Sequence, residues 1–228
     1  MRYLLTFAAV LFSWTAFGQD ADFSFYNVSI ASKSALSTTD LLSKMRTAIK
    51  QHPAIEVAFL MSAKSAQGEL LGDFSGTVQA QGHAFKMVNP QLELFCDGKS
   101  KWILSTEINE LTIFPNDTSD TDLVENPIGF LTSLGTQTSS YSYSARLKES
   151  NGNWVVELIP SNKIMPYKSV LVGIDKVSNL PVKIEYTAKD GSSYVVVIKS
   201  FKPSSGWPLD SFIFPANRMK GLVVTDLR

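Results

Sequence analysis

The chain has 228 residues, of which 44% are hydrophobic and 11% aromatic, and this is enough apolar surface to bury a core. Lysine plus arginine equals aspartate plus glutamate at 21 each, so no global field favours nucleic acid or an anionic membrane. No local basic cluster in the sequence changes that expectation. We therefore expect one folded domain that does not bind nucleic acid.

Residues 1–18 have the pattern of a signal peptide. Arg2 supplies a positive charge, residues 4–12 are apolar, and Ala16-Phe17-Gly18 offers small residues for cleavage near Gly18. The apolar run is too short for a comfortable membrane span. This stretch predicts export of the mature chain.

The polar, serine-rich residues 19–37 predict a loosely ordered leader, and residues 38–228 predict a single domain. The domain begins with a helix, since Ser37-Thr38-Thr39-Asp40 has the form of a capping box. Pro53 ends the helical pattern. The residues at helical spacing are Leu41, Met45, Ala48, Ile49 and His52.

A strand pattern of period two follows Pro53, with Ile55, Val57, Phe59 and Met61 on one side. Glycines at positions 68, 72, 76 and 82 then interrupt further extended pieces. Gly76 and Gly82 mark either bulges that bend the sheet or ordinary turns.

Residues 75–114 read as successive antiparallel strands around the turn Asp97-Gly98-Lys99. Large apolar residues alternate on both sides of this turn, and we expect them to lie on one face that needs a cover. They are Phe85, Met87, Leu92 and Leu94 before the turn, and Trp102, Leu104, Leu111 and Ile113 after it.

A second, short helix is predicted where Asn126 can cap and Pro127 suits the first helical position. Its apolar residues are Ile128, Phe130, Leu131 and Leu134. Alternating runs separated by turn residues predict later strands at 141–147, 154–160, 169–174, 182–187 and 194–201, and a final pair at 212–214 and 222–226.

This tally of about ten strands and two helices predicts a mainly β fold with few helices. A sheet of that size must close into a barrel, split into a sandwich, or half-close around the helices. We expect a strongly curved antiparallel sheet that forms a half-open β-barrel with an α-helical lid. An apolar ligand cavity between lid and sheet follows as a hypothesis.

Catalytic signals are weak. The chain has no nucleophile elbow, phosphate loop or metal-binding motif, and its histidines are His52 and His83. Catalysis that pairs His83 with a distant serine is the minor alternative. The single cysteine, Cys96, cannot form an internal disulfide, and a small buried side chain is favoured over a redox or nucleophilic role. We expect no enzyme activity, no cofactor and no metal.

The order of these features resembles the LolA family of periplasmic lipoprotein carriers, from about Asp40 to the end of the chain. The matching pieces are the opening helix at 41–51 with its strand at 55–61, Gly76 leading to Phe85, the turn at 97–99 followed by Trp102, Asn126-Pro127 heading the short helix, and the ending from Phe212-Ile213-Phe214-Pro215 through Gly221 to Arg228.

The resemblance implies a periplasmic, monomeric half-open barrel whose apolar cavity holds the acyl chains of lipoproteins or another lipid. It also implies an inner-membrane transporter that releases the lipoprotein and an outer-membrane acceptor that receives it. Typical members carry a basic residue followed by proline as a lid latch. Residues 79–84 have neither, so the latch is not carried over.

We predict an apolar ligand site instead of a catalytic one. The alternative for each residue is plain core packing. An alternative function is a sensor or interaction module of the cell envelope that binds lipid or lipoprotein without transport. The predicted wall is Phe59, Met61, Phe85, Met87, Leu94, Trp102, Leu104 and Ile113, and the predicted lid is Ile128, Phe130, Leu131 and Leu134.

Overall fold

The computed structural model describes residues 29–30, 37–117, 127–134, 143–161, 165 and 167–228. The predicted signal peptide and nearly all of the predicted leader lie outside these residues. The elements, in chain order, are β1 (Ser29–Ile30), α2 (Thr38–Lys50), β2 (Ala54–Lys64), β3 (Leu70–Gln81), β4 (Ala84–Val88), β5 (Leu92–Cys96), β6 (Ser100–Ser105), β7 (Glu110–Pro115), α3 (Pro127–Ser133), β8 (Tyr143–Ser150), β9 (Asn153–Pro160), β10 (Tyr167–Ile174), β11 (Pro181–Ala188), β12 (Ser193–Ser204), η1 (Leu209–Phe212), η2 (Ala216–Arg218) and β13 (Val223–Asp226).

All described strands belong to one sheet, in the order β1-β8-β9-β10-β11-β12-β2-β3-β4-β5-β6-β7-β13. Neighbouring strands are antiparallel except β13, which runs parallel to β7. The pairing of β2 with β12 joins the two halves of the sheet, from Ala54 opposite Ser204 to Lys64 opposite Ser193. The predicted mainly β, antiparallel fold with few helices is confirmed.

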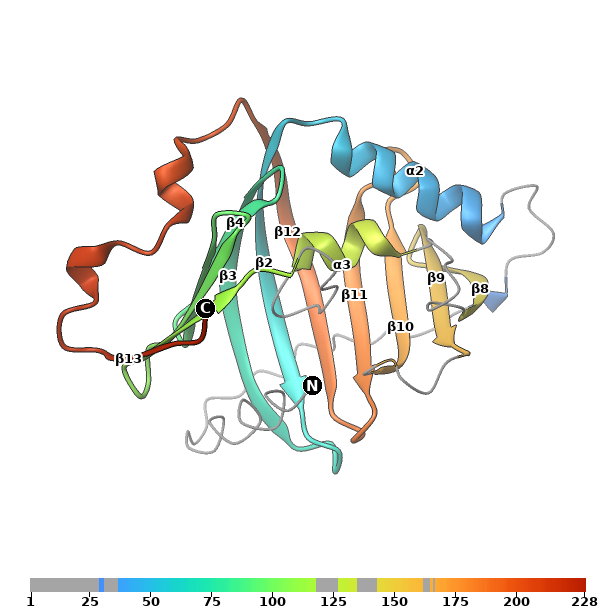
Figure 1. The fold of residues 1–228 in the computed structure, drawn as a ribbon. Coiled ribbons are helices and arrows are strands. Elements are labelled where there is room, and N and C mark those ends of the chain that lie inside the picture. The colour runs from blue at the N-terminus through green and yellow to red at the C-terminus, as the bar shows by residue number, and fades with distance from the viewer. Residues whose placement is uncertain (1–28, 31–36, 118–126, 135–142, 162–164, 166) are drawn as a thin grey trace.

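The two predicted helices are present, and both lie against the same face of the sheet (Figure 1). Helix α2 begins where the capping box indicated, because the Ser37 side chain accepts a hydrogen bond from the Asp40 backbone N–H at 3.0 Å. No helix among the described residues is long and apolar enough to cross a bilayer.

The C-terminal segment, residues 205–228, covers the other face of the β4–β7 strands (Figure 1). The prediction of a strand at 212–214 is wrong. Leu209–Phe212 is a 3-10 helix, and the next short helix begins just after Pro215. Pro208 and Pro215 lack the N–H groups that a strand would need on both sides of this stretch.

Candidate functional site

Two hydrophobic clusters lie on opposite faces of the sheet. The inner cluster lies under the helices, which contribute Leu41, Leu42, Met45 and Ile49 from α2 and Phe130 and Leu131 from α3, with Leu134 directly after α3. Its sheet residues come from both halves of the chain. They include Val57, Phe59, Val78, Phe85, Met87, Leu94, Ile103, Val156, Leu158, Val170, Val172 and Ile184.

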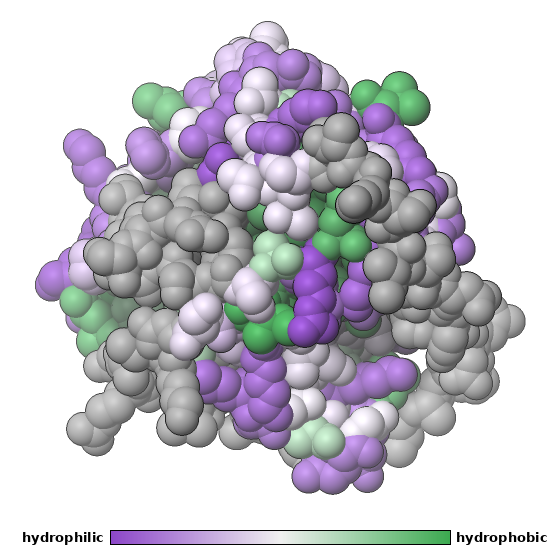
Figure 2. Space-filling model, turned by 90° about the vertical axis from the view of Figure 1, so that its right-hand side faces the viewer, coloured by the Kyte–Doolittle hydropathy of each residue, from purple (hydrophilic) through white to green (hydrophobic). Residues whose placement is uncertain are grey.

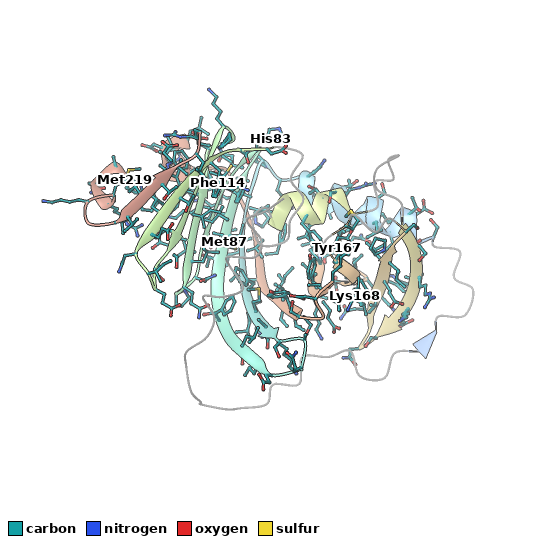
Figure 3. All side chains as sticks on the ribbon, turned by 60° about the horizontal axis from the view of Figure 1, so that its bottom comes forward. His83, Met87, Phe114, Tyr167, Lys168 and Met219 are labelled. Atoms are coloured by element: carbon teal, nitrogen blue, oxygen red, sulfur yellow. The ribbon has the colours of Figure 1, made fainter. Side chains whose placement is uncertain are left out.

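The outer cluster lies under the C-terminal segment. Its buried members are Phe95, Trp102, Leu104, Leu111, Ile113 and Phe214, with Met219 and Leu222 packed at its edge. In Figure 3, Met219 lies on the side of the β4–β7 strands away from Tyr167, which belongs to the inner cluster. The sheet between the two clusters is therefore buried on both faces.

This division corrects part of the predicted wall. Trp102, Leu104 and Ile113 are in the outer cluster, so they do not face the helices, and Leu111, which was expected on the same face as Leu94, also lies there. The reason is the strand register across the turn at 97–99, which pairs Leu94 with Ile103 and Phe95 with Trp102. Cross-strand partners have their side chains on the same face of the sheet. Even-numbered residues of β5 therefore share the inner face with odd-numbered residues of β6, and the even-numbered residues of β6 lie on the outer face.

The other predicted residues lie mostly where the hypothesis needs them. Phe59, Phe85, Met87 and Leu94 from the sheet are buried in the inner cluster. Phe130, Leu131 and Leu134 are buried in it from the helix side, and Met61 is half-buried at its edge. The Ile128 side chain lies outside the described part of the chain. Burial in one cluster agrees both with core packing and with a ligand site.

Three tyrosines of the inner cluster were not predicted. Tyr167, Tyr186 and Tyr194 stand on β10, β11 and β12, with ring centroids 5.5 Å apart for the first two and 6.0 Å apart for the second two. Phe130 of α3 lies 6.3 Å from Tyr186, edge to face. Aromatic pairs at these spacings add to the burial energy. The period-two pattern of these strands was visible in the sequence, but it does not say which set of side chains points inward.

Part of the inner face is only half-covered. Val196 pairs with Met61 on one side and with Ile184 on the other, and Val196 and Met61 are half-buried. Other half-buried members are Leu147, Trp154, Tyr194, Ile198 and Phe201. Figure 2 shows hydrophobic side chains gathered in the middle of one face of the molecule, with hydrophilic side chains beside them. An apolar molecule could extend this cluster without unfolding the sheet.

Gly76 allows the closest packing on the inner face. It pairs with Phe59, and a Cβ atom at position 76 would stand 2.5 Å from the Phe59 ring carbon Cζ and 2.8 Å from the Val88 carbonyl oxygen. Only glycine leaves room for the ring to lie on the β3 backbone. Gly82, in contrast, is an ordinary turn residue with a φ of +61°.

Helix α2 is held on the sheet by apolar side chains. Within the described residues, its side-chain hydrogen bonds stay in the helix or its cap, from Thr47 Oγ1 to the Ser43 carbonyl and from the Asp40 N–H to Ser37 Oγ. Its inward side chains Leu41, Leu42 and Met45 are almost completely buried. Hydrophobic contact is non-directional, so this attachment permits sliding or exchange.

In the stretch at 79–84, where the resemblance leads one to expect a lid latch, Ala80 belongs to the inner cluster while Gln79 and Gln81 make hydrogen bonds. Gln79 Nε2 donates to Glu56 Oε2 at 3.0 Å. The Trp207 backbone N–H donates to Gln81 Oε1 at 2.8 Å, which fastens the C-terminal segment to β3. Gln81 therefore helps to attach the C-terminal segment to the sheet.

The reactive residue types are placed as structural groups. Cys96 is buried, its Sγ lies 3.8 Å from the His83 carbonyl oxygen, and burial raises the pKa of its thiol. The His52 ring packs 6.3 Å from the Phe201 ring. Within the described ranges, no group of three histidine, cysteine or carboxylate side chains is placed to hold a metal ion.

No protein-family model matches the chain, and no curated protein matches it. Among solved structures, the chain is similar to an uncharacterized conserved protein from Thermus thermophilus, at 12% identity and a TM-score of 0.51, over 84% of this chain and 99% of that one. The two share a fold.

Two further similar structures have lower scores. One is a LolA superfamily protein from Nitrosomonas europaea, at 13% identity and a TM-score of 0.42, over 79% of this chain and 99% of that one. The other is the Mycobacterium tuberculosis lipoprotein LppX, at 14% identity and a TM-score of 0.40, over 76% of this chain and 100% of that one.

Proposed function

We propose that this protein is an exported carrier that holds the acyl chains of lipoproteins between its helices and the inner face of a curved, half-open sheet. The observation that carries the proposal is the attachment of α2. This helix covers an apolar face that continues over both halves of the sheet, and within the described residues it is fixed there only by apolar side chains. In this proposal α2 and α3 form a movable lid.

The energetics favour exchange between helix and ligand. Burying a methylene group is worth about 0.8 kcal/mol whether it belongs to a leucine or to an acyl chain. An acyl chain that enters under α2 replaces Leu41, Leu42 and Met45 as the cover of the inner cluster. The net cost of opening is then small, so cargo can be bound and released again.

Transport follows from this reversible binding. Cargo would be received from an inner-membrane transporter and delivered to an outer-membrane acceptor, the two partners that the LolA resemblance implies. No cofactor, metal or reaction is needed for such a transfer. The ligand-contacting residues would be Phe59, Met61, Phe85, Met87, Leu94, Ile128, Phe130, Leu131 and Leu134.

The direct test is uptake of an apolar fluorophore by the purified protein, followed by displacement with a diacylated lipopeptide. We expect an increase in fluorescence without loss of β structure, and a decrease on adding lipopeptide. Lipid extraction and mass spectrometry of protein from its native envelope should recover an acyl species. No uptake would show that the inner cluster is filled by its own side chains, and the proposal would be wrong.

A matched pair of variants separates binding from stability. Leu131 is 5% exposed in the inner cluster and Leu104 is 4% exposed in the outer cluster. We expect Leu131→Asp to weaken fluorophore binding by about tenfold or more, because a carboxylate in the apolar site must be desolvated. We expect Leu104→Asp to lower stability without changing the affinity of the remaining folded protein.

Handover distinguishes transport from simple binding. Protein loaded with a labelled lipopeptide is mixed with acceptor vesicles that carry an outer-membrane lipoprotein receptor. A carrier releases its cargo to the vesicles, whereas a binding module of the cell envelope keeps it.

A further inference from the structure

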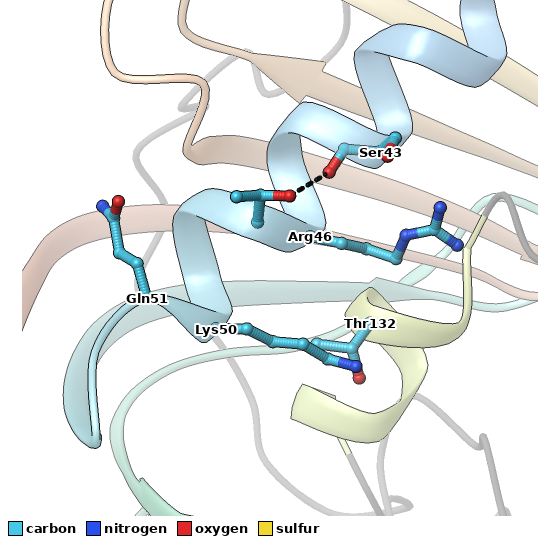
Figure 4. A pocket seen from close by; sticks show the side chains of 6 residues that line it. Ser43, Arg46, Lys50, Gln51 and Thr132 are labelled. Atoms are coloured by element: carbon cyan, nitrogen blue, oxygen red, sulfur yellow. Dashed lines mark hydrogen bonds between the residues drawn. The ribbon is translucent and has the colours of Figure 1, made fainter.

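The two helices form a groove lined by residues with polar or charged ends, on the side away from the sheet (Figure 4). This groove has a volume of about 580 Å³ and is lined by Ser43, Arg46, Thr47, Lys50, Gln51 and Thr132. Five of these residues belong to α2 or follow it directly, and Thr132 belongs to α3. The acyl-binding proposal makes no use of these side chains.

The groove carries two positive charges. Arg46 and Lys50 are one helical turn apart, so they project from the same face of α2, and in Figure 4 both side chains extend toward α3. No carboxylate is among its described lining residues. Among the ion pairs of the described residues, none involves Arg46 or Lys50.

Helix stability explains only part of this arrangement. Lys50 is in the last turn of α2, where a positive charge is favourable beside the carboxyl end of the helix dipole. Arg46 stands one turn earlier and reaches the same groove, where the lining residues other than Lys50 carry hydroxyl or amide groups. The two charges together form a place where an anion would be held by several donors.

We propose that this groove binds a phosphate group, as found in the headgroup of an anionic phospholipid or in a free phosphate. A guanidinium presents two parallel N–H donors that match two phosphate oxygens, and an ammonium adds a point charge. The Thr47 and Thr132 hydroxyls donate to the Ser43 and Gly129 carbonyls, so Arg46 and Lys50 are the main donors to the anion. This site is independent of the acyl-binding proposal, because it lies on the opposite side of α2.

The sequence could not reveal this site. Helix α2 carries three basic residues, Lys44, Arg46 and Lys50, but their spacing does not show that Arg46 and Lys50 line one groove, and the chain as a whole carries no net charge. The groove exists only because α3, which is far from α2 in the sequence, packs beside it.

The test is co-sedimentation of the purified protein with phosphatidylcholine vesicles that contain or lack phosphatidylglycerol. We expect binding only to the phosphatidylglycerol vesicles and only at low ionic strength. A basic side chain near such a surface contributes roughly fivefold in affinity, so Arg46→Gln with Lys50→Gln should lower binding about 25-fold. Calorimetry with inorganic phosphate, in chloride of matched ionic strength, measures the free anion.

The control is Lys199→Gln with Lys202→Gln, which removes the same charge from two exposed lysines of β12. If both double variants bind equally weakly, the effect is one of net charge and the proposal is wrong. Absence of binding to both vesicles and phosphate also overturns it. If the protein binds inorganic phosphate but not the vesicles, the groove is a site for soluble phosphates. If it binds the vesicles but not inorganic phosphate, the groove is a site for lipid headgroups.

Fluorophore uptake is measured on the same variants. Unchanged uptake with lost anion binding supports the groove as a separate site. If uptake is absent in every variant while anion binding persists, the carrier proposal fails and the phosphate site stands.

Discussion

The two faces of the sheet are covered in different ways. Helix α2 lies on the inner cluster through apolar contacts, and within the described residues its polar side-chain bonds stay in the helix and its cap. The C-terminal segment lies on the outer cluster through apolar contacts and also through hydrogen bonds to the sheet. Val223–Asp226 pairs with β7, and the Leu227 N–H donates to the Ile113 carbonyl at 2.8 Å.

An ion pair strengthens the outer cover further. Arg218 donates two hydrogen bonds of 2.8 Å to the two carboxylate oxygens of Glu93 on β5, and its guanidinium lies 5.1 Å from the centre of the Phe214 ring. Directional bonds hold a segment in one place, whereas apolar contact alone does not. The outer cover is therefore held by directional bonds, and in the proposed carrier the inner cover is the one that exchanges.

The largest effects on stability should come from truncating a buried leucine in either cluster. Leu94 and Leu111 are both fully buried, the first in the inner cluster and the second in the outer one. Leu94→Ala and Leu111→Ala should each lower the free energy of unfolding by about 2–5 kcal/mol, measured by urea titration. Only Leu94→Ala should change fluorophore affinity. An equal change in both variants would mean that the two faces are not functionally distinct.

Gly76→Ala probes the tightest contact of the inner face. The new methyl group meets the Phe59 ring and the Val88 carbonyl, so we expect a loss of about 1–3 kcal/mol in thermal or urea unfolding. Adding Phe59→Leu should restore part of this loss, because it removes the ring but not the carbonyl. Gly82→Asn is the control, since nothing lies within 4 Å of its Cβ position and asparagine tolerates a positive φ.

Removing the ion pair between Arg218 and Glu93 should have a smaller effect on stability. Arg218→Gln should cost about 0.5–1 kcal/mol, because the Arg218 side chain is partly exposed. Backbone amides of Val223–Asp226 should exchange faster with deuterium, while amides of α2 keep their rates. Faster exchange in α2 would show that the two covers are coupled, contrary to the comparison.

The same pair makes stability depend on pH. The hydrogen bond from Arg218 is the main cause that lowers the pKa of Glu93 below its ordinary value of 4.5, against the opposing effect of burial. The unfolded chain therefore binds more protons in this range, and the stabilisation is present above pH 4.5 and is lost as the pH falls through the lowered folded value. Unfolding curves of Glu93→Gln should lose this part of the acid dependence. An identical slope in both proteins would contradict the assignment.

The smallest effect is a kinetic one. Cys96 is fully buried in the inner cluster, and its thiol has a raised pKa because of burial. Alkylation by iodoacetamide should be slow in the native protein and fast in urea. A bound acyl ligand should slow the native reaction further if the inner cover opens to admit the reagent. Rapid native alkylation would show that the cluster is open around Cys96.

Local signals in the sequence were reliable guides to structure. The capping box at 37–40 set the start of α2, and the Asp97-Gly98-Lys99 turn joined two strands as expected. In that turn Asp97 Oδ1 accepts from the Lys99 and Ser100 N–H groups, an interaction between near neighbours in the chain. Such features depend only on a few consecutive residues.

The predictions were wrong where strand register, or pairing between distant strands, determines which face of the sheet a side chain lies on. Apolar and polar residues alternate on both sides of the 97–99 turn. The register of the turn pairs Trp102 with Phe95, and both side chains therefore lie on the outer face. The strand predicted at 222–226 is confirmed as β13, whereas the strand predicted at 212–214 is wrong. Phe214 is instead buried in the outer cluster, on a face of the sheet whose cover the sequence did not indicate.

The pairing of β2 with β12 also bears on how the chain folds. It brings Ala54 against Ser204 and Lys64 against Ser193, so the centre of the sheet cannot form until nearly the whole chain is available. Contacts between such distant segments slow folding, because a long loop must close before any of them forms. An apolar β2 that waits for its partner also risks aggregation. For this fold, assembly in the cell should depend on a chaperone, or on delivery of the chain unfolded and entire.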